Sequence, residues 1–116
     1  GKTLNAGQVC ITADYCYIPD ALLDDFVSGI KDVYSTYFSR CLDNDDYVSI
    51  INKRHFDRLS DYLRDAENRG GHVINLGNPK EDWLNSDKLK IPLHLVVNPT
   101  DNMLVMQETH CVRHNT

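Results

Sequence analysis

Apolar residues recur every three or four positions in two separate stretches of the chain. The first stripe consists of Leu22, Phe26, Ile30, Val33 and Tyr37. This spacing keeps the side chains on one side of a helix, so it predicts a helix of about 16 residues with a buried apolar face. Asp20 directly follows a proline and is predicted to cap the start of this helix.

The second stripe consists of Phe56, Leu59, Leu63 and Ala66. Asn52 is a suitable cap for the start of the corresponding helix. Gly70-Gly71 is a common way to end one, because glycine tolerates the left-handed backbone conformation. The chain therefore predicts two amphipathic helices, separated by an acidic loop from Cys41 to Tyr47.

Three short stretches have the composition of strands: Tyr15 to Ile18, His72 to Asn75 and Leu93 to Val97. Gly77 to Asp87 is polar and predicts a loop, and Met103 to Glu108 predicts a short helical turn. The order strand, helix, helix, strand, strand predicts an α/β fold with a mainly parallel sheet and flanking helices. The fold is expected to be incomplete, because few strands are present to cover two amphipathic helices.

Two aromatic residues in this part of the chain have simple structural explanations. Trp83 lies in the polar loop and is expected to anchor it by packing. His94 alternates with Leu93 and Leu95, so it is expected to face the opposite side of the sheet from both leucines.

The overall composition argues against two classes of partner. The net charge is −5, and the basic cluster Lys53, Arg54 and Arg58 is interleaved with Asp57 and Asp61. This pattern is typical of a solvated helix face, so no nucleic-acid partner is expected. No apolar run approaches the roughly 20 residues of a membrane span, so no membrane partner is expected either.

The four cysteines, Cys10, Cys16, Cys41 and Cys111, form no C-x-x-C pattern. A domain of this size with helical patterns does not need disulfides, which favours a reducing compartment and a cytoplasmic location. Cys16 is expected to be an inert, packed thiol on the first strand. Cys41 is expected to be unreactive, because its acidic neighbourhood raises the thiol pKa.

The stretch that carries chemistry is Asn5-Ala6-Gly7-Gln8-Val9-Cys10. It resembles the cysteine motif of the aldehyde dehydrogenase superfamily, in which a Gly-Gln-x-Cys segment presents the nucleophile. Asp14-Tyr15 and Ile18-Pro19 fall where that family has a strand entering a helix. Met106-Gln107-Glu108 resembles the start of the family's Glu-Glu-x-Phe-Gly-Pro segment.

The resemblance extends over about residues 1–108, which are therefore expected to form part of an aldehyde dehydrogenase catalytic domain. Ile50 to His55 and Pro92 to Asp101 resemble the coniferyl aldehyde dehydrogenase branch of the family. The resemblance implies an oxidoreductase that uses NAD or NADP, acts on an aldehyde of aromatic type, and forms homodimers or homotetramers as the intact parent.

The resemblance assigns the catalytic role to Cys10. Its thiolate would add to the aldehyde carbonyl, hydride would leave for the nicotinamide ring, and water would hydrolyse the resulting thioester to the acid. The backbone N–H of Cys10 would stabilise the developing oxyanion, and Gly7 would permit the turn that exposes the thiol. The competing interpretation is a buried, inert cysteine, which is the common state of a free thiol.

Several parts of such an enzyme have no counterpart in this chain. The family's nucleotide-binding domain, general-base glutamate and side-chain oxyanion donor lie upstream of the cysteine. No cofactor is therefore expected to bind to this chain, which is expected to be inactive alone. The family has a second Glu after the position of Glu108, and Thr109 stands there instead. Residues 109–116 are accordingly expected to be a divergent tail, either disordered or frame-shifted.

The tail also contains His110, Cys111 and His114, residue types that bind zinc. Their spacing matches no common zinc pattern, so a solvated terminus and no metal site are expected. Two other functions stay open. The chain could be a non-catalytic remnant that acts as an interaction or oligomerisation module. It could also be a stand-alone cysteine hydrolase, which would require a histidine base near Cys10.

Overall fold

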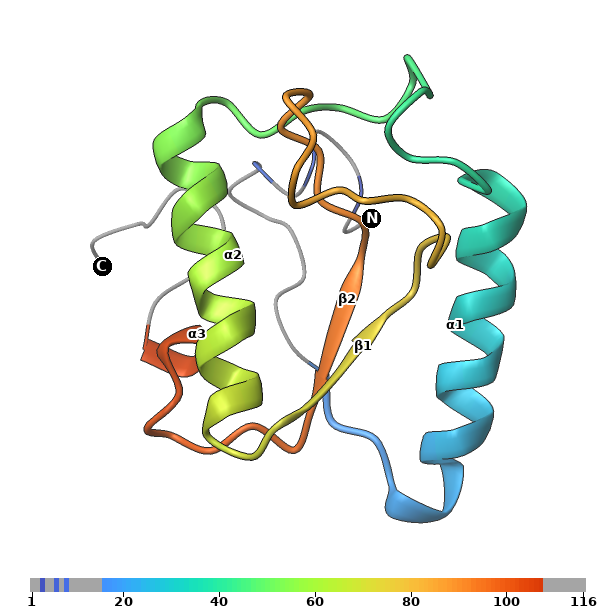
Figure 1. The fold of residues 1–116 in the computed structure, drawn as a ribbon. Coiled ribbons are helices and arrows are strands. Elements are labelled where there is room, and N and C mark those ends of the chain that lie inside the picture. The colour runs from blue at the N-terminus through green and yellow to red at the C-terminus, as the bar shows by residue number, and fades with distance from the viewer. Residues whose placement is uncertain (1–2, 4–5, 7, 9–15, 108–116) are drawn as a thin grey trace.

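The computed structural model describes residues 3, 6, 8 and 16–107 of the chain. Its elements follow in the order η2 (Asp20–Leu22), α1 (Leu23–Tyr37), α2 (Lys53–Asn68), β1 (His72–Asn75), β2 (His94–Val97) and α3 (Leu104–Gln107). The β1–β2 pair lies between α1 and α2, and α3 lies beside α2 (Figure 1). The two long helices thus flank a small sheet from opposite sides.

The α1 helix is found where the first stripe predicts it, but its start and its buried face differ from the prediction. Asp20 forms the first residue of the 3₁₀ turn η2, and no side chain caps either η2 or α1. Tyr34 is the buried residue of α1, whereas Val33 and Tyr37 are 58% and 73% exposed. Part of the apolar stripe therefore packs against no described residue of the core and stays exposed.

The α2 helix agrees closely with the sequence. The Asn52 side chain accepts a hydrogen bond from the His55 backbone N–H at 2.9 Å, as an N-terminal cap should. Phe56 and Ala66 are buried on the predicted face. Gly70 follows the helix with a φ of +86°, which confirms the predicted glycine ending.

The sheet corrects the prediction of a mainly parallel arrangement. Within the described residues it has two strands, and β1 pairs with β2 in antiparallel register, His72 with Val97 and Asn75 with His94. The ladder continues past the ends of the strands, since the Leu76 N–H donates to the Leu93 carbonyl at 2.9 Å. Parallel neighbours need a crossover connection, usually a helix. The segment between β1 and β2 contains no helix and simply returns along the sheet.

The predicted first strand is wrong over its described part. Residues 16–19 adopt no strand, and Tyr17 is 92% exposed. Tyr15, the first residue of that prediction, lies outside the described residues. A strand is stabilised by pairing with a neighbour, and no other strand of the described part lies beside this segment.

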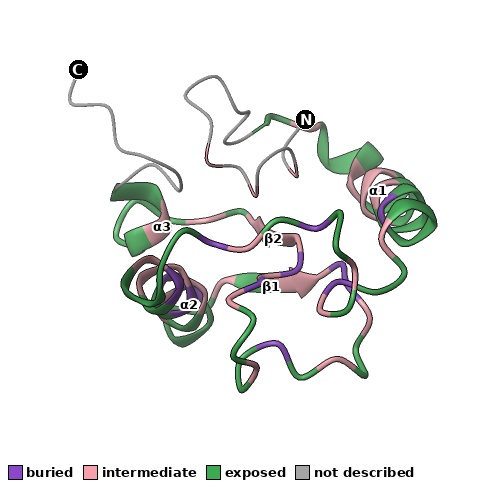
Figure 2. Ribbon diagram, turned by 90° about the horizontal axis from the view of Figure 1, so that it is seen from above, coloured by how far each residue is buried: buried purple, intermediate pink, exposed green. Residues whose placement is uncertain are grey.

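The interior is divided into two clusters. The first contains Tyr34, Cys41, Tyr47 and Leu76, between α1 and the sheet. The second contains Ile50, Phe56 and Trp83, between α2 and the loops that flank the sheet. Figure 2 shows buried residues both in α2 and in the loops around the strands. Trp83 packs edge-on against Phe56 with ring centroids 6.0 Å apart, which confirms that it anchors its loop.

Candidate active site

The predicted nucleophile, Cys10, lies outside the described residues, so its exposure and its neighbours stay a prediction. Two described residues precede it closely in sequence. Ala6 packs against the second core cluster, and its φ of +54° places its backbone in the left-handed region. The Gln8 side chain forms hydrogen bonds to the backbone of Ser49 and Ile51. The segment that leads to Cys10 is therefore joined to the body of the domain at Ala6 and Gln8.

The Gln8 side chain bonds to the backbone of the stretch just before α2. Its Nε2 donates to the Ser49 carbonyl oxygen at 3.2 Å, and its Oε1 accepts from the Ile51 N–H at 2.8 Å. Both ends of the carboxamide are thus engaged with backbone groups two residues apart. This contact joins positions separated by 41 and 43 residues in sequence.

The Ser49–Ile51 stretch is itself held from another segment. The Ser49 hydroxyl donates to the Lys88 carbonyl at 2.8 Å, and the Ile50 N–H donates to the Leu89 carbonyl at 2.7 Å. The Ile50 side chain is buried in the second core cluster. Gln8 therefore binds a stretch of chain that is fixed by both hydrogen bonds and packing.

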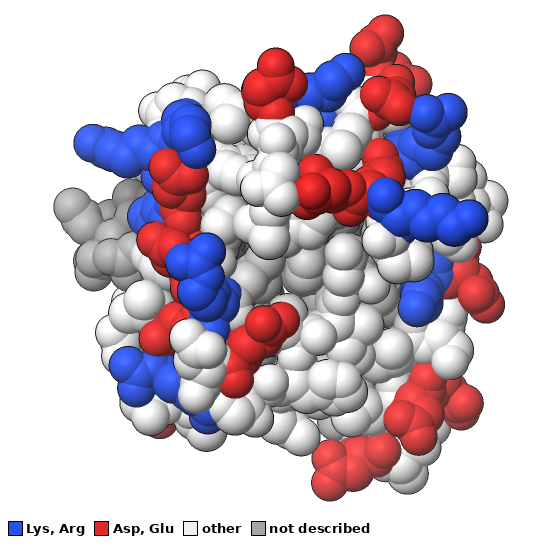
Figure 3. Space-filling model, in the orientation of Figure 1, with Lys and Arg blue, Asp and Glu red and all other residues white. Residues whose placement is uncertain are grey.

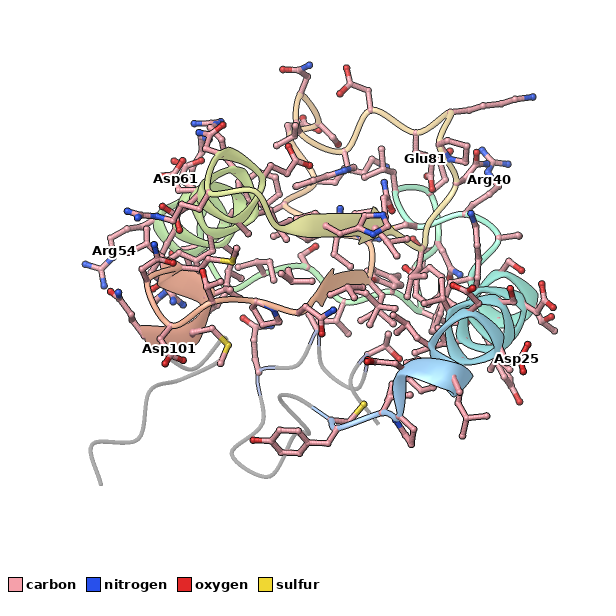
Figure 4. The ribbon with its side chains drawn as sticks, turned by 90° about the horizontal axis from the view of Figure 1, so that it is seen from below. Asp25, Arg40, Arg54, Asp61, Glu81 and Asp101 are labelled. Atoms are coloured by element: carbon pink, nitrogen blue, oxygen red, sulfur yellow. The ribbon has the colours of Figure 1, made fainter. Side chains whose placement is uncertain are left out.

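Cys41 lies in a buried network on the opposite side of the sheet from α2. Its backbone N–H and that of Leu42 donate to the two oxygens of Glu81 at 2.8 and 2.9 Å. Glu81 lies on the loop after β1 and points to the turn after α1, near Arg40 (Figure 4). Lys90 closes the same turn by donating to the carbonyls of Leu42 and Asn44 at 3.4 and 2.7 Å.

Burial raises the pKa of the Cys41 thiol to about 12, and the Glu81 carboxylate adds to the shift. The thiol stays protonated at neutral pH and is a poor nucleophile. The prediction that Cys41 is unreactive is supported, although the larger cause is burial and not the acidic neighbourhood. Cys16 departs from its prediction, since it is exposed and belongs to no strand.

His94 on β2 is half-buried, and its pKa is shifted from the ordinary value. Its ring lies 5.2 Å from the Trp83 ring, and its Nδ1 is 2.7 Å from the Pro92 carbonyl oxygen. Burial lowers the pKa of His94, which favours the neutral ring. Leu93 and Leu95 pack against the first core cluster and Trp83 belongs to the second, which supports the prediction that His94 faces the other side of the sheet.

Among residues 3, 6, 8 and 16–107, we assign no residue to the binding of NAD or NADP. The sequence has no G-x-G-x-x-G motif of the kind that cradles a pyrophosphate. The open hollow between α1 and the loop after β1 has a volume of about 310 Å³. It is lined largely by apolar atoms, and the cation at its edge is Lys31.

No group of three metal-binding side chains occurs among residues 3, 6, 8 and 16–107. His110, Cys111 and His114 lie outside that part of the chain, as do Glu108 and Thr109. In the same part, no helix has the length and apolar character needed to cross a bilayer.

Sequence reasoning missed two contacts that organise this region. One is the pair of hydrogen bonds from Gln8, and the other is the pair of N–H groups bound by Glu81. The Gln8 signal was present in the Gly-Gln-x-Cys motif, but the partner of the side chain could not be read from it. Glu81 carries no sequence signal, because its partners lie about 40 residues away.

Comparison with known proteins gives a consistent picture. The family model described as "Aldehyde dehydrogenase family" matches residues 1–111. A coniferyl aldehyde dehydrogenase from Pseudomonas sp. is 45% identical over 107 residues, which is 92% of this chain and 22% of that protein. A probable coniferyl aldehyde dehydrogenase from Caulobacter vibrioides is 42% identical over 108 residues, 93% of this chain and 22% of that protein. The chain thus spans about a fifth of the length of these relatives.

Proposed function

Because the chain belongs to the aldehyde dehydrogenase family, we propose that it is the nucleophile-bearing part of an NAD(P)-dependent enzyme that oxidises an aldehyde to a carboxylic acid. The observation that carries this proposal is the Gly7-Gln8-Val9-Cys10 motif within the matched residues. The chain covers about a fifth of its relatives, so the reaction belongs to a whole enzyme of which this is one portion.

Cys10 acts as the nucleophile in this proposal. An ordinary cysteine thiol has a pKa of about 8.5, so it is partly ionised at neutral pH. The thiolate adds to the aldehyde carbonyl to form a thiohemiacetal, and a thioester on the same sulfur is later hydrolysed to release the acid. A backbone N–H at Cys10 donating to the substrate oxygen would stabilise the developing charge by roughly 3 kcal/mol.

An aromatic aldehyde of the coniferyl type is the proposed substrate. One relative at 45% identity is named coniferyl aldehyde dehydrogenase, and two at 40–42% are named probable coniferyl aldehyde dehydrogenase. NAD or NADP supplies the hydride acceptor in the whole enzyme, held by residues beyond those described. We further propose a cytoplasmic location and a dimeric or tetrameric parent, in line with the expectations from the sequence.

The test uses a chimaera in which this chain replaces the matched stretch of the Pseudomonas coniferyl aldehyde dehydrogenase. Production of NADH or NADPH with coniferyl aldehyde is expected, and Cys10→Ser should lower kcat by at least about a thousandfold. Cys16→Ser is the matched control, because Cys16 is exposed and should leave kcat unchanged. Full activity of the Cys10→Ser chimaera would refute the proposed role. The 116-residue chain alone is expected to produce no NADH. Rapid turnover by the isolated chain would refute the proposal that it supplies one portion of a larger active site.

An interaction module is the second candidate, and the exposed face of α1 favours it. Val33 and Tyr37 are 58% and 73% exposed and fall on one side of α1. Leu22, at the end of the preceding η2 turn, is 53% exposed. Gly29 lies on the same side, with open space around it. Acidic side chains gather over the start of this helix, at the lower right of Figure 3. The stripe would suit self-association or a partner with an apolar surface rimmed by basic side chains.

Analytical ultracentrifugation distinguishes this candidate from a solitary chain. Association is expected to weaken at least tenfold in Val33→Asp, whereas Ser28→Asp on the polar face of the same helix should leave it unchanged. A chain that stays monomeric at the highest soluble concentration would rule out self-association through α1.

A further inference from the structure

The Gln8 carboxamide is matched in shape to the backbone that it binds. In an extended chain the carbonyl of one residue and the N–H of the residue two positions later point to the same side. Gln8 uses its donor on the Ser49 carbonyl and its acceptor on the Ile51 N–H. Two opposed hydrogen bonds from one planar group fix both its distance and its rotation. Neither bond could be reproduced by a shorter or a purely apolar side chain.

The stretch on the other side of these bonds is held by packing and by hydrogen bonds of its own. Ile50 is 6% exposed, and its N–H is bound to Leu89. Asn52 follows immediately and caps α2. Gln8 therefore forms hydrogen bonds to the stretch that connects the second core cluster to α2. Ala6 packs on the same cluster, so the segment is held at residues 6 and 8.

We propose that Gln8 is a positioning residue for the reaction, which fixes the backbone two residues before Cys10. This inference rests on the proposed role of Cys10 as nucleophile. Two residues of chain span at most about 7 Å, so the anchor is separated from the nucleophile by no more than that length of backbone. A misplacement of about 1 Å in a reacting group lowers rates by about a hundredfold, so this attachment bears on turnover as well as on folding.

Two substitutions at Gln8 and one control test the hydrogen bonds in the chimaeric enzyme described above. Gln8→Met keeps the length of the side chain and removes both bonds. Gln8→Glu keeps the acceptor for the Ile51 N–H and loses the donor. Asn85→Leu is the matched control, since it removes an exposed amide whose bond is to Asp82 and not to the Ser49–Ile51 stretch.

The measurements are kcat, KM for coniferyl aldehyde, and the rate of Cys10 alkylation by iodoacetamide as a function of pH. Gln8→Met should lower kcat per folded enzyme at least tenfold with KM changed less than about threefold, and should move the pH midpoint of alkylation at Cys10. Gln8→Glu sets a carboxylate oxygen against the Ser49 carbonyl, where two acceptors repel, so it should lower kcat at least as far as Gln8→Met. Asn85→Leu should match the parent. Circular dichroism gives the folded fraction, so that a loss of folded protein is not counted as a loss of turnover.

An unchanged kcat and an unchanged alkylation midpoint in folded Gln8→Met would overturn the positioning role. The Cys10→Ser variant tests the proposed function separately. If that variant keeps its activity while Gln8→Met still shifts the alkylation of Cys10, the nucleophile assignment falls and the anchoring of the segment stands.

Discussion

The carboxylate of Glu81 accepts the backbone N–H of Cys41 at 2.8 Å, and its second oxygen accepts the neighbouring N–H of Leu42. One side chain on the loop after β1 thereby satisfies two donors in the turn that follows α1. The contact therefore joins the turn after α1 to the loop after β1. It also places a negative charge close to the buried Cys41 thiol.

Removing this carboxylate should destabilise the domain. Hydrogen bonds to a charged acceptor contribute about 1.5–3 kcal/mol each, and the freed N–H groups are only partly accessible to water. With two such bonds lost, we expect Glu81→Ala to lower the free energy of unfolding by about 3 kcal/mol or more, measured by urea denaturation. Lys80→Ala, at the exposed neighbouring position, is the control. Equal stability of the two variants would contradict the role of Glu81.

The two described cysteines should differ strongly in reactivity. Cys16 is exposed, whereas Cys41 is buried and burial raises its thiol pKa to about 12. Brief iodoacetamide treatment at pH 8 followed by peptide mass spectrometry should find Cys16 modified and Cys41 unmodified. Denaturation in urea should then make both react. Modification of native Cys41 at the rate of Cys16 would show that its environment differs from the one described.

The start of α2 should depend on the Asn52 side chain. Asn52 accepts the His55 N–H, and loss of such a cap costs about 1 kcal/mol. Asn52→Ala should lower the free energy of unfolding by that amount, and Asn52→Asp should retain most of it because it keeps the acceptor. Asn102→Ala is the control, because it removes an exposed asparagine amide outside α2. Its effect on the free energy of unfolding shows what the loss of an amide that caps no long helix costs.

Stability should fall on mild acidification because of His94. Its folded-state pKa is below the ordinary value of 6.5, with burial as the largest cause. The Trp83 ring and the Pro92 carbonyl contact the imidazole, and the Glu67 carboxylate acts on it through space. The stability contributed by the neutral ring is thus fully present above pH 6.5 and is lost as the pH falls through the lower folded-state pKa.

The check is the free energy of unfolding between pH 7.5 and 5, measured for the parent and for His94→Gln. The variant should show a shallower decline over this range. His72→Gln removes an exposed histidine from the end of β1 and serves as the comparison. A parent whose stability is flat from pH 7 to pH 5 would refute the half-buried, neutral state of His94.

Local sequence signals predicted some elements well and others only in part. The α2 helix carried its own information, because an Asn52 cap, a regular apolar stripe and a terminal glycine act within a few residues of one another. The α1 stripe was equally regular, yet Val33 and Tyr37 are exposed. Periodicity indicates which residues share a face of a helix, but not whether another element is present to cover that face.

The Gly-Gln-x-Cys motif and the two amphipathic helices were determined by the sequence itself, and the motif led to the family that the comparisons then matched. Tertiary structure alone decided the antiparallel pairing of β1 with β2, the burial of Cys41 beside Glu81, and the attachment of Gln8 to Ser49 and Ile51. Caps, stripes and turns depend on interactions over a few residues, and the residue types record them. Contacts across about 40 residues depend on which surfaces meet when the chain packs, and no local pattern encodes that outcome.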